Sequence, residues 1–213
     1  MSKVKIAICG IPGTGTNETF TQMKLLCKDE PNITFVDAPD LTKKVHAKDV
    51  VLGDQYLQPS DTTENLKLLC LLRTLRELFR RQKILENRTE IVFYETDIAE
   101  VKTMISANQE IEALTESEAY QLTQLLQTMR LFIKPPELAF ELYCNDSSRI
   151  RRLCNTDSTF EFCTFEYLIA QRKHQDCTNL PFYTKSLETS SITARKNALD
   201  ILYNLSNFLQ FIG

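Results

Sequence analysis

The chain has 213 residues, 43% of them hydrophobic and 25% charged, and its formal net charge at pH 7 is −3. This length suits one globular domain with a substantial core, and this composition excludes an intrinsically disordered chain. The 25 basic side chains are balanced by 28 acidic ones, which argues against a general nucleic-acid binder. No apolar stretch is long enough to span a bilayer, so we expect no transmembrane segment.

The seven cysteines are scattered and form no C-x-x-C pair, and the chain has only two histidines. These counts argue against a structural zinc site, and we expect no bound metal. The amino terminus enters an apolar run almost at once, without the pattern of a secretory signal peptide. Together with the odd number of cysteines, this indicates a reducing compartment.

A glycine-rich turn follows the first expected strand. Residues 4–9 form a β-branched apolar run, and a helical pattern extends from the turn to about residue 28. The turn matches the P-loop template G-x-x-x-x-G-K-[ST] at Gly10 and Gly15, with Gly13 between them. Thr16, however, stands in place of the phosphate-binding lysine, and Asn17 stands in place of the magnesium-binding hydroxyl. The pattern therefore predicts the shape of a phosphate loop without its cation chemistry.

The first turn of the following helix carries a charge that bears on ligand binding. Backbone N–H groups at a helix amino terminus attract anions. Glu18 places a carboxylate in that turn, which favours the helix and disfavours a triphosphate. An ordinary Rossmann-like turn that never bound a nucleotide is the alternative interpretation.

The rest of the chain alternates short apolar runs with helical segments. Further strands are expected at residues 33–36, 91–94, 138–144 and 182–183, and helices at 59–85, 98–107, 117–129, 147–153, 165–173 and 191–209, with a helix plus loop over 41–58. This alternation predicts a parallel sheet of about five strands flanked by helices, a three-layer α/β sandwich. No repeat or linker divides the chain, so we expect residues 1–213 to form a single domain. The apolar stripe on the last helix, with Leu202, Phe208 and Phe211, is predicted to face the core, with an interface as the alternative.

In this order, the motifs resemble those of the deoxynucleoside kinase family, which belongs to the P-loop nucleoside and nucleotide monophosphate kinases. The family has a catalytic carboxylate, typically in Glu-Pro, at the end of its second strand, where this chain has Asp37. At the end of its third strand the family reads Phe-Phe-Glu-Arg-Ser, and residues 93–97 here read FYETD. The resemblance implies vestigial base positions at Asp37 and Glu95, with Thr96 in place of the arginine. A polar strand end is the alternative interpretation of Asp37.

The family's lid follows its fourth strand and reads Arg-Ile-x-x-Arg-x-Arg, and residues 149–155 here read RIRRLCN. The leading Arg-Ile matches, whereas Leu153 and Asn155 replace the two phosphate-clamping arginines. The resemblance places Arg149, Arg151 and Arg152 in the lid, where we expect them to bind an anion or to face an acidic partner. A solvated helix face is the alternative.

All of these departures remove positive charge or a metal ligand from one triphosphate site, and phosphoryl transfer depends on positioning and electrostatics. We therefore expect a catalytically inactive kinase-fold protein that serves as an accessory subunit of a larger assembly. The chain resembles the deoxynucleoside-kinase-like accessory subunit of mitochondrial respiratory complex I (NADH:ubiquinone oxidoreductase). That resemblance implies other protein subunits as partners and a peripheral position on the matrix side of the mitochondrial inner membrane. It implies that the chain binds no cofactor, and a residual bound nucleotide is the alternative.

Two alternatives remain. The chain is then either a divergent kinase, which transfers phosphate from ATP to a (deoxy)nucleoside with Asp37 or Glu95 as base, or a sensor that binds a nucleotide without turnover. For either alternative we expect a cytoplasmic protein.

Overall fold

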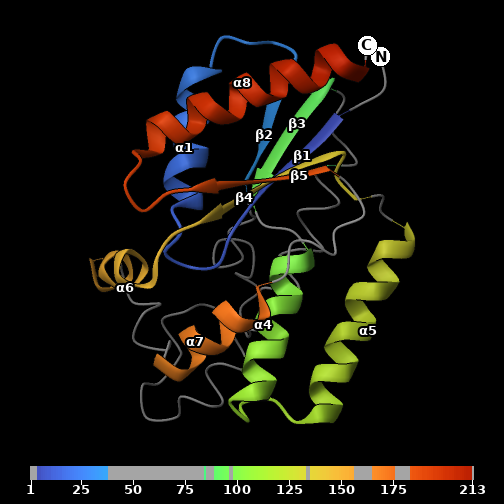
Figure 1. The fold of residues 1–213 in the computed structure, drawn as a ribbon. Helices are drawn as coiled ribbons and strands as arrows, with labels where there is room; N and C mark the ends of the chain where they lie inside the picture. The colour runs from blue at the N-terminus through green and yellow to red at the C-terminus, as the bar shows by residue number, and fades with distance from the viewer. Residues whose placement is uncertain are drawn as a thin grey trace, which may run out of the picture.

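A five-stranded sheet forms the centre of the fold (Figure 1). The structure is a computed structural model, and it describes residues 4–37, 84, 89–95, 98–132, 135–155, 165–175 and 183–212. The strands are β1 (Val4–Cys9), β2 (Ile33–Val36), β3 (Ile91–Glu95), β4 (Leu138–Tyr143) and β5 (Tyr183–Glu188). They lie in the order β2-β3-β1-β4-β5, and every neighbouring pair is parallel. This sheet confirms the predicted fold class.

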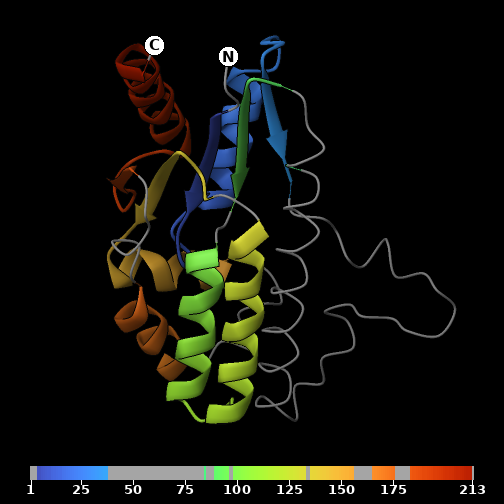
Figure 2. The same cartoon turned by 90° about the vertical axis from the view of Figure 1, so that its right-hand side faces the viewer.

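Six helices surround the sheet within the described part of the chain. They are α1 (Thr16–Leu26), α4 (Ile98–Glu110), α5 (Glu116–Phe132), α6 (Asp146–Asn155), α7 (Phe165–His174) and α8 (Ala194–Ile212). The first and last helices, α1 and α8, pack on each other and cover one face of the sheet (Figure 1). Figure 2 shows α4 and α5 side by side beyond the carboxyl ends of the strands. Helix α7 packs against α4.

The apolar strands are buried on both faces, and the alternation of side chains divides them between two layers. Ile6 and Ile8 of β1 join Phe140 of β4 in the core that α1 and α8 complete. The intervening Ala7 and Cys9 belong to a second cluster on the opposite face. A third cluster lies among the helices, where α4, α5 and α7 bury their facing side chains. The loop between β1 and α1 thus lies at the carboxyl edge of a sheet that is fixed from both sides.

The fifth strand is longer than its sequence indicated. We predicted a strand at residues 182–183, whereas β5 extends over Tyr183–Glu188. Its polar residues hid it, because Lys185 and Ser186 interrupt the apolar run. Both have partners in the structure: Lys185 bonds Asn204 of α8, and the Ser186 hydroxyl donates to Glu141 of β4 at 3.1 Å. An edge strand, which pairs only with β4, tolerates such residues.

The closing helix confirms its predicted role in the core. Leu202 and Phe208 pack against the cluster beneath α1 and α8, whereas the side chain of Phe211 lies outside the described residues. The helix begins at Ala194, later than predicted, and the Thr193 hydroxyl caps it by accepting the Lys196 N–H at 3.3 Å.

The segment 41–58 and, except for Ile84, the helix predicted at 59–85 also lie outside the described residues. None of the described helices is long and apolar enough to cross a membrane.

Candidate functional site

The glycine-rich loop, residues 10–15, connects β1 to α1 at the carboxyl edge of the sheet. Gly13 has a φ of +87°, and a Cβ added there would lie 2.9 Å from Cγ of Arg149. A Cβ on Gly10 would lie 2.4 Å from the Thr14 hydroxyl and 2.6 Å from the Leu142 carbonyl oxygen. Both positions therefore require glycine for backbone conformation or for space. The predicted shape of a phosphate loop is present.

Side chains from distant parts of the chain bond the carbonyl groups of this loop. The Thr189 hydroxyl, just after β5, donates to Thr14 O at 2.7 Å. The Cys144 thiol, just after β4, contacts Gly13 O at 3.5 Å. Burial raises the pKa of this thiol, although the nearby Arg152 and Arg149 oppose the shift. The loop is thus fastened to the ends of two strands, and Cys144 is a buried neutral thiol.

Arg149 on α6 forms the most extensive of these contacts with the loop and its surroundings. Its side chain is only 2% exposed. Nε donates to Pro12 O at 2.9 Å, one terminal nitrogen donates to Leu168 O of α7 at 2.8 Å, and the other donates to Gln171 Oε1 at 2.8 Å. The Gln171 amide in turn donates to the Tyr167 hydroxyl at 2.8 Å. Arg149 therefore does not face a partner as its sequence context implied, because its guanidinium joins the loop to α7 inside the protein.

Arg152 lies one turn further along α6 and also reaches the loop. One terminal nitrogen donates to Gly13 O at 3.3 Å and to the Thr189 hydroxyl at 3.1 Å, and the other donates to Thr189 O. The same guanidinium lies 3.4 Å from the position of a Cβ on Gly15. Arg151, by contrast, is exposed, and its partner-facing role stays a prediction.

The residues that replace the lysine and the hydroxyl of the template begin α1. Thr16 and Asn17 occupy its first turn, and Gly15 caps it in a left-handed conformation without a side-chain cap. The Glu18 carboxylate lies 3.9 Å from the Cβ position of Gly15. The first turn of α1 therefore adds a negative charge and no positive charge beside the loop.

The two predicted base positions lie at the ends of neighbouring strands. Val36 of β2 is in register with Tyr94 of β3, so Asp37 and Glu95 are the next positions along these two strands. Asp37 is paired with Lys24 of α1, and its side chain is 62% exposed. The sequence analysis did not single out Lys24, because its position on a helix does not indicate that the end of β2 lies beside it. The neighbours of Glu95 along the chain, residues 96–97, lie outside the described residues.

A cleft opens beside the loop, between the amino termini of α1 and α8. Its volume is about 270 Å³, and it is lined by Gly15, Glu18, Thr19, Arg152, Thr189, Ile192, Thr193, Ala194 and Asn197. Sequence reasoning missed Thr189 and Asn197, which belong to the turn after β5 and to the first turn of α8. The only available signal was the general rule that ligands bind at the carboxyl ends of parallel strands.

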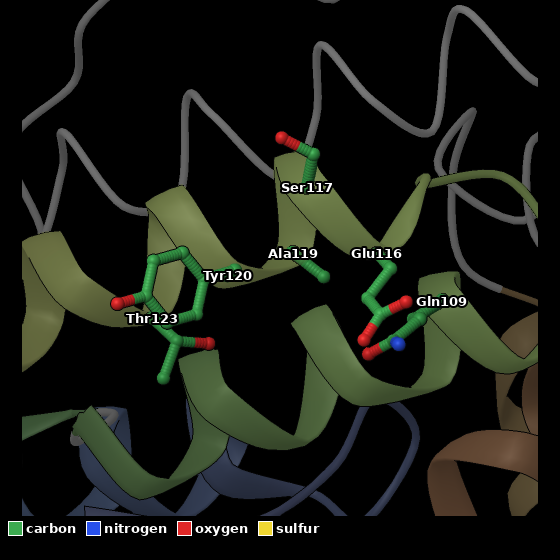
Figure 3. Close-up of a pocket in the computed structure, with 6 residues that line it drawn as sticks. All are labelled: Gln109, Glu116, Ser117, Ala119, Tyr120 and Thr123. Atoms are coloured by element: carbon green, nitrogen blue, oxygen red, sulfur yellow. The ribbon is translucent and has the colours of Figure 1, made fainter.

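A second hollow, of about 500 Å³, lies in the helical layer between α4 and α5 (Figure 3). The Tyr120 ring borders it and is 63% exposed, and Glu116 lies beside Gln109 at its other end. It contains none of the predicted site residues, so the candidate site remains the loop and the adjoining cleft.

Comparisons with known proteins identify the fold. No protein-family model and no curated protein matches the chain. Deoxyadenosine kinase from M. mycoides with bound dATP is similar in structure, with a TM-score of 0.70 and 12% identity over 95% of this chain and 99% of that chain. The same enzyme with bound dCTP gives a TM-score of 0.69 and 15% identity over the same shares of the two chains.

Thymidylate kinase from Candida albicans is similar as well, with a TM-score of 0.63 and 13% identity over 97% of this chain and 92% of that chain. These neighbours show that the chain has the P-loop nucleoside kinase fold over nearly its whole length.

Proposed function

We propose that this chain is a catalytically inactive kinase-fold protein that serves as an accessory subunit of a larger assembly. The observation that carries the proposal is the chemistry at the start of α1. Thr16 and Asn17 occupy the template positions of the lysine and the magnesium-binding hydroxyl, and Glu18 adds a carboxylate next to them. A triphosphate bound at this loop would meet the Glu18 carboxylate without the lysine and the magnesium-binding hydroxyl of the template.

The arginines of α6 support the same proposal. Phosphate-clamping arginines act by offering N–H groups to phosphate oxygens. Arg149 instead uses both of its terminal nitrogens and Nε on Pro12, Leu168 and Gln171. Arg152 bonds Gly13 and Thr189. In this arrangement both guanidinium groups stabilise the protein, and transferring their bonds to a phosphate would leave loop carbonyls without partners.

Membership in an assembly is the finer part of the proposal. The resemblance in sequence motifs suggests mitochondrial respiratory complex I as that assembly, with the chain on the matrix side of the inner membrane. Exposed Arg151, on the outer side of α6, provides a charge for an acidic partner. Purification of the tagged protein from its native source, followed by mass spectrometry of the associated chains, tests this part. Respiratory-complex subunits in fixed stoichiometry are the expected result, and recovery of the chain alone would contradict it.

Inactivity is tested by a panel of deoxynucleosides and nucleoside monophosphates with ATP and Mg²⁺. We expect no phosphorylated product from the natural chain. The double variant T16K/N17S restores the template, and we expect it to bind ATP·Mg²⁺ more tightly than the natural chain does. Turnover by the natural chain would instead support the divergent kinase, with Asp37 or Glu95 as base. In that case Asp37→Asn and Glu95→Gln identify which carboxylate takes the proton.

A further inference from the structure

One face of α5 provides most of the lining of the hollow between α4 and α5. Glu116, Tyr120 and Thr123 follow one another at spacings of four and three residues, which place them on the same side of a helix. Gln109 of α4 completes the lining at the end where Glu116 lies (Figure 3). Ala119, which also lines the hollow, is 3% exposed, and its side chain is too small to fill the space.

The hollow is open to solvent. The Tyr120 ring is 63% exposed, and Glu116 and Ser117 are exposed as well. The volume of about 500 Å³ lies within the roughly 300–1,000 Å³ of ligand pockets, but such pockets enclose most of their ligand and are lined mainly by apolar side chains. Apart from Tyr120 and Ala119, the described residues that line this hollow are polar. It therefore suits a side chain that projects from a protein partner better than it suits a small molecule.

The charge around the hollow indicates that this side chain is a cation. Residues 103–129 contain four glutamates and no lysine, arginine or histidine. Glu110 is already paired with Lys173 and His174 of α7, whereas no ion pair among the described residues includes Glu116. None of the described residues that line the hollow is basic. The Glu116 carboxylate therefore attracts a cation from outside the chain.

An arginine side chain matches both of the groups that border the hollow. A guanidinium stacks on the face of an aromatic ring and forms two parallel hydrogen bonds to a carboxylate. Tyr120 provides the ring, and Glu116 provides the carboxylate one helical turn away. A lysine ammonium carries the same charge, but it lacks the planar group that stacks on the ring and pairs with both oxygens. The Gln109 side-chain oxygen and the Thr123 hydroxyl are acceptors for the remaining N–H groups.

We propose that the hollow between α4 and α5 is a docking site for an arginine side chain on a basic segment of a protein partner. The proposal deepens the proposed function, on which it rests for the existence of a partner, because it names a surface and the chemistry that recognises it. The contact is opposite in charge to the one proposed at Arg151. It is also separate from the glycine-rich loop and its cleft, because the hollow and the cleft have no described lining residue in common.

NMR titration of the ¹⁵N-labelled full chain tests the surface, with the tripeptide acetyl-Gly-Arg-Gly amide as the probe. The comparison peptide carries citrulline, which has the shape of arginine without its charge. We expect the arginine peptide to shift the backbone N–H signals of residues 116–123 and to bind at least about tenfold more tightly than the citrulline peptide. Added salt should weaken this binding, because the hollow is open to solvent. Equal binding of the two peptides, or unchanged signals for residues 116–123 at millimolar concentrations of the arginine peptide, would overturn the proposal.

Two pairs of matched variants separate the hollow from the general charge and exposure of the surface. Glu116→Gln and Glu112→Gln each remove an exposed carboxylate, but only Glu116 lines the hollow. Tyr120→Ala and Tyr203→Ala each remove an exposed tyrosine, and Tyr203 lies on α8. We expect the hollow variant of each pair to weaken binding of the arginine peptide about fivefold or more, and the control to change it less than about twofold. Equal effects within both pairs would refute the assignment.

Purification of tagged variants from the native source distinguishes the failure of this inference from the failure of the proposed function. Glu116→Lys reverses the charge in the hollow, and Glu112→Lys is the control. We expect the natural chain and the control to retain their partner subunits and Glu116→Lys to lose at least one of them. Retention of every partner by a folded Glu116→Lys variant would overturn this inference and leave the assembly in place.

Recovery of the natural chain alone would contradict the proposed function, and the peptide titration would then be the test of the hollow. Sedimentation of the purified chain tests a second copy as the occupant. Self-association that Glu116→Lys abolishes and Glu112→Lys retains would assign the hollow to a second copy and overturn the proposal of a different partner.

Discussion

Replacing Arg149 by methionine removes one side chain that three segments share. Methionine keeps much of the aliphatic packing of arginine but offers no hydrogen bonds. The change leaves Pro12 O, Leu168 O and Gln171 Oε1 without their donors at 2.8–2.9 Å. Leu168 O lies within α7 and keeps its helical partner four residues on. The main cost therefore arises at Pro12 and Gln171.

Each buried acceptor that loses its partner costs about 1–3 kcal/mol, while removal of the buried charge returns part of its desolvation penalty. We expect a net loss of about 3–5 kcal/mol, within the roughly 2–6 kcal/mol that two such unpaired acceptors cost together. In a domain of this size, ~1 kcal/mol lowers Tm by about 2–4 °C, so the variant should melt about 6–20 °C below the natural chain.

Guanidinium chloride unfolding followed by circular dichroism measures this loss directly. Arg151→Met is the matched control, because Arg151 is exposed and adjoins the same helix turn. It should change the free energy of unfolding by no more than about 0.5 kcal/mol. A loss below ~1 kcal/mol for Arg149→Met, with an unchanged denaturant slope, would refute the role of Arg149 as the link between loop and α7.

Three further changes probe other contacts. Gly13→Ala should destabilise the protein by at least ~1 kcal/mol in the same unfolding assay, because alanine is strained at a φ of +87° and its Cβ has no space. Thr19→Val removes a buried hydroxyl without a partner, so it should raise the free energy of unfolding by about 1 kcal/mol, and a lower Tm would contradict the assignment. Glu110 accepts hydrogen bonds from Lys173 and His174, which lower its pKa. Its stabilising contribution is therefore complete above the pKa of an unfolded glutamate and disappears as the pH falls through its lower folded pKa. The stability difference between the natural chain and Glu110→Gln should shrink over that acidic range, and a difference independent of pH would be evidence against it.

The parts of the fold that local pattern determines were predictable. Buried parallel strands read as continuous apolar runs, so β1 to β4 were located within a residue of their bounds. The glycine spacing predicted the loop, because the available space at Gly10 and the backbone conformation at Gly13 exclude other residue types. The β5 strand was underestimated because its polar residues find partners only when β4 and α8 are in place.

The candidate site was less predictable because its contacts join residues that are far apart in sequence. Arg149 and Arg151 look alike in an arginine-rich helix, yet one is buried and the other is exposed. Only the convergence of Pro12 O, Leu168 O and Gln171 on one point separates them. The cleft depends in the same way on two helix termini that are 178 positions apart in the chain, at residues 16 and 194.

The bonds between α6 and the loop also bear on how such a protein changes over evolutionary time. A loop that served only phosphate would be free to drift once phosphate binding ended. Here the loop carbonyls hold Arg149, Arg152 and Thr189 in place, so its shape contributes to folding whether or not a ligand is bound. Selection for stability alone would preserve the glycines while leaving positions 16 and 17, where the template has lysine and a hydroxyl residue, free to vary. A ligand-binding loop can in this way be retained for its contribution to stability, whether or not it still binds a ligand.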